Sequence, residues 1–210
     1  TEFDTGSRVL FRVAFRALVA SGPGRLAVGS MVAGQVVMVA VMTMPPWHMK
    51  DGGHQLELIG FVISLHIIGM YALSPLVGWL TDRIGPRLVI AAGGIMLIVG
   101  SEFASHTDPE HSTGVFTGLF LIGLGWSFGL VASSSLIATT FQGPQRVRVQ
   151  GLADLMMTAS GGFAGLGSGL VVSLTDFRTL SHYSGILGLY PTVAVLIVSL
   201  VGRRTGAYRA

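Results

Sequence analysis

Three ionisable side chains interrupt otherwise apolar stretches of this sequence, and they are the first candidates for chemistry. His66 lies well inside the second apolar stretch, Glu102 near the end of the third, and Asp154 near the start of the fifth. Burying an ionisable group in an apolar environment is costly, so such residues are default candidates for a functional site. His66 is the best suited of the three to carry a proton, because histidine titrates near physiological pH.

Each of these residues also has a structural alternative. His66 is equally well explained as a neutral imidazole that is hydrogen-bonded to a neighbouring helix. Asp154 is preferably interpreted as an acid near a helix N-terminus, where the helix dipole favours it, or as a partner of Arg146 or Arg148. Glu102 is expected to extend its carboxylate toward the polar interface.

Two polar or aromatic residues, Gln35 and Trp126, lie in stretches that carry no charge. We expect both to line a substrate cavity, with ordinary helix packing as the alternative. Together with His66 and Asp154 they form the predicted substrate and proton pathway.

Other kinds of chemistry find little support. The chain contains no cysteine, which excludes disulfides, thiolate metal sites and cysteine nucleophiles. His48 and His54 flank a polar loop without a recognised metal-ligand spacing, so a solvated loop is expected there and no metal site. Hydrolase, metalloprotease and phosphate-binding motifs are also missing from the sequence. We therefore predict a protein that is not an enzyme and has no cofactor.

The composition indicates the elements that position these residues. Half of the 210 residues are apolar and 11 % are charged, against about a quarter charged in a soluble domain. A soluble globule and a disordered chain are both excluded. A membrane-spanning helix needs roughly 20 apolar residues. The predicted fold is an all-α, six-helix transmembrane bundle, kinked at Pro75 and Pro191, whose spans cover about 27–46, 58–80, 88–105, 112–141, 149–174 and 184–202.

The basic residues predict the orientation of these spans. Eleven of the thirteen fall on one side, and Lys50 and Arg178 fall on the other. Such an alternation places both termini in the cytoplasm, and it explains the basic character of the chain without nucleic-acid binding. The eleven arginines are Arg8, Arg12, Arg16, Arg25, Arg83, Arg87, Arg146, Arg148, Arg203, Arg204 and Arg209.

The first 25 residues differ from the rest of the chain. Arg8, Arg12 and Arg16 lie four apart and form one stripe of a helix, with apolar residues on its other faces. This pattern predicts an amphipathic helix on the inner leaflet, which residues 21–24 end before the first span. We divide the chain into a linker with this helix (1–25), a bundle (26–203) and a cytoplasmic tail (204–210).

The loop between the second and third spans carries the most informative motif, Gly78-Trp-Leu-Thr-Asp-Arg-Ile-Gly-Pro-Arg87. It resembles the loop signature of the major facilitator superfamily of secondary transporters, although Pro86 stands where that family usually has a basic residue. The resemblance implies a cytoplasmic gate formed by Gly78, Asp82, Arg83, Gly85 and Arg87. It also implies two six-helix halves that rock about a central cavity.

The resemblance also implies which half this is, because the fourth span of the family's first half normally carries an arginine and the fourth span here has none. Residues 63–75, 117–129 and 142–154 resemble spans eight and ten and the loop into span eleven of an uncharacterised bacterial branch of the family. The chain is thus expected to be the C-terminal half of a proton-coupled exporter of a small molecule in the bacterial inner membrane. Its partners would be the lipid bilayer and an N-terminal half or a second copy. The alternative is a non-transporting or truncated membrane protein, or an assembly subunit, that retains the fold.

Small residues recur at four-residue spacing in two spans. Gly161, Gly165 and Gly169 form a double repeat in the fifth span. Gly114 with Gly118, and Gly125 with Gly129, repeat the spacing in the fourth. Such seams allow close helix packing in membranes, so we expect these glycines to lie at helix–helix contacts.

Overall fold

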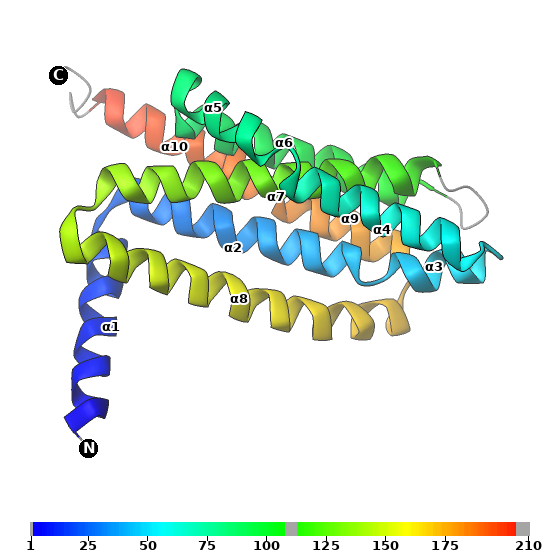
Figure 1. Ribbon diagram of the computed structural model, residues 1–210, viewed down its shortest axis with the longest axis horizontal. Coiled ribbons are helices and arrows are strands. Elements are labelled where there is room, and N and C mark those ends of the chain that lie inside the picture. The colour runs from blue at the N-terminus through cyan, green and yellow to red at the C-terminus, as the bar shows by residue number, and fades with distance from the viewer. Residues whose placement is uncertain (1, 108–112, 205–210) are drawn as a thin grey trace.

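The computed structural model describes residues 2–107 and 113–204, and the side chains of residues 11–107 and 113–200. The described residues form helices and no strand (Figure 1). The helices are α1 (Glu2–Ala20), α2 (Gly22–Met42), α3 (Pro45–Asp51), α4 (Leu56–Tyr71), α5 (Ser74–Ile84), α6 (Pro86–Ser105), α7 (Thr113–Thr140), α8 (Gly143–Leu174), α9 (Phe177–Leu187) and α10 (Leu189–Arg204).

Six spans account for this helical bundle and confirm the predicted fold. Within the described residues, the helices long and apolar enough to cross a membrane are α2 with α3, α4 with α5, α6, α7, α8, and α9 with α10. Three spans are interrupted next to a proline, which lacks the N–H that the preceding turn needs. Pro75 lies in the first turn of α5, so the predicted kink is confirmed. The interruption near Pro191 lies at Gly188, just before α10 begins.

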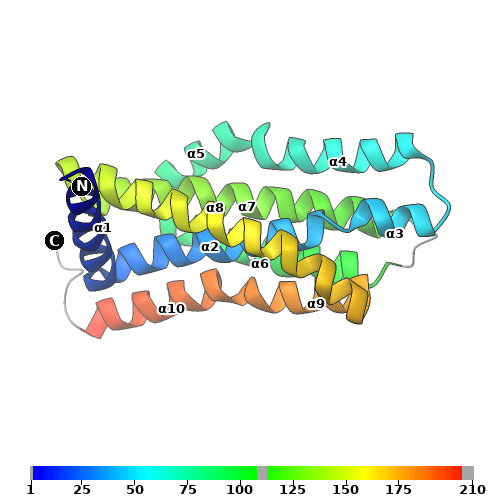
Figure 2. The ribbon, with the colours of Figure 1, turned by 90° about the horizontal axis from the view of Figure 1, so that it is seen from below.

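The connections alternate between the two ends of the bundle, as the basic residues predicted. The turns α5–α6 and α7–α8 lie at the same end as α1 and the end of α10, whereas α3 and the turn α8–α9 lie at the other (Figures 1 and 2). We call the first the arginine-rich end and the second the opposite end. The spans therefore run antiparallel in sequence, and the long axis of the bundle is the direction in which they cross a membrane.

The most extensive helix contact joins α6 to α7 and depends on four glycines. A Cβ atom added at Gly93 would lie 2.8 Å from the backbone oxygen of Gly125, and one added at Gly100 would lie 2.7 Å from that of Gly118. Each separation is shorter than side-chain packing permits, so the two backbones touch. The prediction of close packing is confirmed for Gly118 and Gly125. The two glycines on each helix are seven residues apart. The contact therefore follows a seven-residue spacing, and not the four-residue spacing noted in the sequence.

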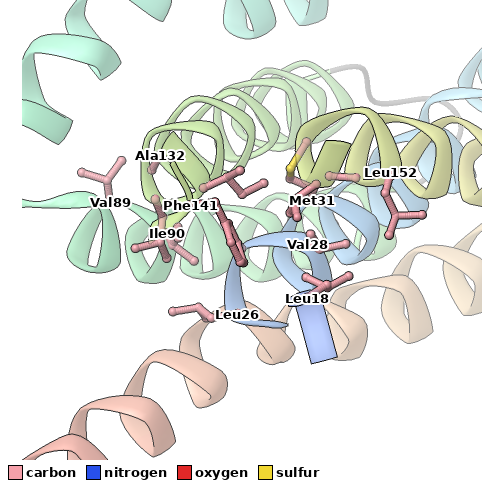
Figure 3. Close-up of a cluster of buried hydrophobic side chains, with 14 of the residues drawn as sticks. Leu18, Leu26, Val28, Met31, Val89, Ile90, Ala132, Phe141 and Leu152 are labelled. Carbon is pink, nitrogen blue, oxygen red and sulfur yellow. The ribbon is translucent and has the colours of Figure 1, made fainter. Parts of the chain in front are cut away.

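A hydrophobic cluster closes the arginine-rich end (Figure 3). Leu18 of α1 is buried in it with Leu26 and Met31 of α2. The start of α2 is fixed here, because Ser21 caps it: the backbone N–H of Gly24 donates to Oγ of Ser21 at 3.1 Å. This cap and Pro23 place the first turn at Gly22, as expected for residues that separate the amphipathic helix from the first span.

Candidate functional site

The two residues expected to line a cavity, Gln35 and Trp126, meet at the centre of the bundle. The indole Nε1–H of Trp126 donates to Oε1 of Gln35 at a distance of 2.7 Å. Trp126 lies at the midpoint of α7, and Gln35 lies near the middle of the span formed by α2 and α3. The sequence named these residues separately, and the structure brings them together at mid-depth.

Tyr71 and Gly161 complete this arrangement, and we call the four residues the central cluster. The Tyr71 ring meets the Trp126 ring edge-on, with centroids 5.9 Å apart. A Cβ added at Gly161 would lie 2.7 Å from Nε2 of Gln35, so this glycine leaves room for the amide. Tyr71 was missed from the sequence. Its place just before Pro75, in the middle of a span, is the signal by which it could have been found.

The central cluster lies across four spans that pack in the order α4, α7, α2 and α8. Trp126 is 7 % exposed, whereas Tyr71 is 58 % exposed. The cluster therefore combines a buried, satisfied hydrogen bond with an accessible phenol. Amide, indole and hydroxyl groups among apolar helices are what a pocket for a small organic molecule typically offers.

His66 lies outside the central cluster, in the contact between α4 and α7. Its side chain is fully buried, and Nδ1 lies 2.7 Å from the backbone oxygen of Leu119. Because a carbonyl oxygen accepts, Nδ1 carries the proton of the neutral ring. Nε2 is buried and has no hydrogen-bond partner among the described residues. Gly123 permits this contact, since an added Cβ would lie 2.5 Å from the His66 backbone oxygen.

Asp154 is not brought to the central cluster. It lies on an exposed part of α8, and its Oδ1 accepts from Nε2 of Gln150 one turn earlier at 2.9 Å. In the described part of the chain it forms no ion pair with Arg146 or Arg148. This hydrogen bond lies within one helix.

The loop motif forms the turn from α5 to α6 at the arginine-rich end. Gly85 has φ +89°, a backbone conformation that other residues rarely adopt, which explains the glycine in the motif. Arg83 lies 5.4 Å from the ring centre of Trp79, within cation–π range. Asp82 is exposed and Arg87 is partly buried. A Cβ added at Gly78 would meet no described atom within 4 Å, so this helix face has no close neighbour here.

The glycine repeat of α8 is only partly used within the described chain. Gly161 contacts Gln35, and a Cβ added at Gly165 would make an ordinary 3.5 Å contact with Val39. Gly169 has no described atom within that reach, and the same is true of Gly162 and Gly151. The prediction of helix packing therefore stays open for Gly169.

Polar contacts join α6 to α9 at the opposite end. Glu102 extends to the surface as expected, and its Oε1 accepts from Nδ1 of His182 at 2.8 Å. Nε of Arg178 donates to the backbone oxygen of Ser105 at 2.9 Å. A cavity of about 740 Å³ opens beside these contacts, between α3 and the α8–α9 turn. It lies away from the central cluster.

Asp176 caps α9 at this end. Its Oδ1 accepts from the backbone N–H of Thr179 at 2.6 Å. This bond holds the pKa of the exposed Asp176 carboxyl below its ordinary value of 3.8, and further hydrogen bonding from Thr179 and the nearby charge of Arg178 act in the same direction.

Sequence comparisons agree with this architecture. The profile of the Major Facilitator Superfamily matches residues 26–207. The uncharacterized MFS-type transporter YdeG of Bacillus subtilis is 38 % identical over 159 residues, which are 76 % of this chain and 37 % of that protein. Riboflavin transporter RfnT of Brucella anthropi is 26 % identical over 179 residues, or 85 % of this chain and 43 % of that protein.

A third relative, multidrug resistance protein Stp of Mycobacterium tuberculosis, is 30 % identical over 125 residues, which are 59 % of this chain and 23 % of that protein. The chain thus spans less than half the length of each of these relatives. The family match and the apolar spans together identify an integral membrane protein. The chain belongs to the Major Facilitator Superfamily.

Proposed function

We propose that this chain is the C-terminal half of a secondary transporter that exports a small molecule by alternating access, driven by protons. Its arginine-rich end would face the cytoplasm of a bacterial cell. The central cluster is the single observation that carries this proposal, because it places polar and aromatic groups at mid-depth where four spans meet. The relative named as a multidrug resistance protein favours export.

The outer helix α8 of this four-span row has a largely exposed surface, which supports the presence of a second half. Of the most apolar part of α8, 11 % is buried, compared with 61 % for α2–α3 and for α7. On α8, Phe163 is 76 % and Leu166 is 80 % exposed. Gly162 and Gly169 on the same helix have no described neighbour within 4 Å of an added Cβ. Glycine favours close helix approach in membranes, so this surface suits another transmembrane helix better than lipid.

In this proposal Gln35, Trp126 and Tyr71 contact the transported molecule. Tyr71 is the accessible member, whereas Gln35 reaches the molecule only when its bond to Trp126 opens. His66 takes up the coupling proton at Nε2, which is the unpartnered nitrogen of the ring. Asp82, Arg83 and Arg87 contact the second half at the cytoplasmic side and gate the cavity.

The substrate proposal is tested by a ligand-stabilisation screen on the purified protein. Riboflavin and a panel of hydrophobic drugs are the first compounds, because the names of RfnT and Stp suggest them. A true ligand should raise the melting temperature of the wild type and of the surface variant Trp79→Phe, but not that of Tyr71→Ala. A compound that stabilises Tyr71→Ala as strongly as the wild type would remove the central cluster from substrate binding.

The partner of α8 is tested separately. Reading the coding region upstream of Thr1 for six further spans in frame distinguishes a transporter half from a half-sized protein. If those spans are absent, a cysteine in place of Gly162 should form a disulfide. Because the chain has no other cysteine, this disulfide must join two copies. The matched control is Ile95→Cys on the exposed face of α6. Equal cross-linking at both positions, or none, would contradict a specific α8 interface.

His66 is tested by proton flux in proteoliposomes once a substrate is known. Unchanged substrate-driven proton uptake in His66→Asn would exclude the proposed role. The second candidate function, an assembly subunit that does not transport, would be favoured if no compound stabilises the wild type and α8 captures a different membrane protein.

A further inference from the structure

The helix α1 lies crosswise to the spans, at the arginine-rich end of the bundle (Figures 1 and 2). Ala14 and Leu18, one turn apart, are buried in the hydrophobic cluster of that end. The cluster also contains residues of α2 and α8, and α1 packs against both helices. Because the spans cross the membrane along the long axis, a crosswise helix at their end lies in the plane of the membrane surface.

The exposed side chains of α1 combine aromatic and basic residues. Phe11 and Phe15 are exposed, and their rings stack with centroids 6.3 Å apart. Arg12 and Arg16 are also exposed, and each follows one of these phenylalanines. At 100° per residue the two arginines form a stripe directly beside the aromatic stripe. Val19 extends the aromatic stripe by another turn and is exposed as well.

We propose that Phe11, Phe15, Arg12 and Arg16 form a binding surface for anionic phospholipid headgroups of the adjoining leaflet. Guanidinium groups match phosphate geometry with two parallel hydrogen bonds. Aromatic side chains beside them insert at the boundary between headgroups and acyl chains. This inference goes beyond transport, since it does not depend on the substrate, the coupling ion or the second half.

Headgroup binding has a consequence for the bundle, because α1 is attached through Ala14 and Leu18. The same helix that binds lipid with its exposed side chains packs against α2 and α8 with its buried ones. Anionic lipid therefore fixes the position of α1 against these two helices. A membrane without anionic lipid leaves α1 attached by its buried face alone.

The test uses the whole chain in nanodiscs, and a single cysteine introduced as Val19→Cys carries an environment-sensitive dye. No native cysteine competes for the label. Discs of phosphatidylcholine alone are compared with discs that contain phosphatidylglycerol, with acrylamide as a neutral quencher. We expect blue-shifted emission and roughly twofold weaker quenching in the anionic discs, as for a helix that enters the interface. Arg12→Gln with Arg16→Gln should abolish this difference.

The matched control is Arg146→Gln with Arg148→Gln, which removes the same charge from the start of α8. It should keep the response to anionic lipid. The proposal would be overturned if the label responded equally to both lipids, or if both double variants lost the response alike. A label shielded only at protein concentrations at which the chain dimerises would identify a second copy as the occupant and would also overturn it. Soluble glycerol phosphate added to phosphatidylcholine discs should not reproduce the shift, because a free phosphate provides no interface.

Discussion

The Nε1–H of Trp126 donates a 2.7 Å hydrogen bond to Oε1 of Gln35 and thereby links α7 to α2 at mid-span. The indole nitrogen is a donor only, and Trp126 is almost completely buried, so it depends on this acceptor. The amide nitrogen of Gln35 lies on the side of Gly161. The pair is therefore a structural link between α7 and α2.

Removing either partner of this bond should cost stability. We expect Trp126→Phe and Gln35→Ala each to lower the melting temperature, and the double variant to be less destabilised than the sum. The coupling should be about 1 kcal/mol, the usual net value of such a bond. Thermal unfolding in one detergent measures the cycle. Trp79→Phe, at an exposed indole on α5, is the control and should behave as the wild type. Strict additivity would show that the bond contributes nothing.

The glycine contact between α6 and α7 should tolerate no side chain. Gly100→Ala places a Cβ 2.7 Å from a backbone oxygen, which cannot move aside as a side chain can. We expect a loss of about 1–3 kcal/mol, typical of overpacking. Gly169→Ala is the matched substitution on a surface with no described neighbour, and it should leave the stability of this chain unchanged or slightly increased. Equal effects of the two substitutions would contradict the assigned contact.

Two substitutions of His66 distinguish its structural function from its titratable one. His66→Asn keeps an N–H donor near the position of Nδ1 and so can retain the bond to the Leu119 oxygen. His66→Ala loses that bond and leaves a void, at a cost of about 1–3 kcal/mol. We expect Ala to lower the melting temperature clearly and Asn to lower it less. If the two variants unfold at the same temperature, the bond to Leu119 does not stabilise the contact.

The cap at Asp176 predicts a pH dependence. Since the folded-state pKa of this carboxyl is lowered, its stabilisation is present above the ordinary value of 3.8 and is lost as the pH falls through the folded pKa. Asp176→Ala should therefore lower the melting temperature at pH 7, and the difference from the wild type should shrink below pH 3.8. Asp176→Asn keeps a capping oxygen without a titrating group and should show less of this pH dependence. A deficit in Asp176→Ala that is constant with pH would exclude the carboxylate cap.

Much of this architecture follows from the sequence because a membrane imposes simple constraints. Uncharged stretches of sufficient length predicted the six spans, and the alternating arginines predicted which connections share an end. The loop motif indicated the family. Hydropathy contains no information about which helix faces meet, so it could not pair Gly93 with Gly125 or bring Tyr71 beside Trp126. The four-residue spacing of glycines in α8 suggested that Gly169 lies at a helix–helix contact, yet its helix face has no described neighbour. Spacing alone could not show this, because packing partners depend on the tertiary arrangement.

The backbone contact of α6 with α7 restricts how the bundle can change shape. Four glycines bring the two backbones into direct contact, so sliding one helix along the other would bring side chains against backbone. The pair must then move as one rigid block. Any bending falls to the three spans with an interrupted hydrogen-bond ladder, at Thr43–Met44 between α2 and α3, at Leu73 between α4 and α5, and at Gly188 between α9 and α10. Those three breaks lie in the spans around this rigid pair, and they are where we expect the bundle to bend.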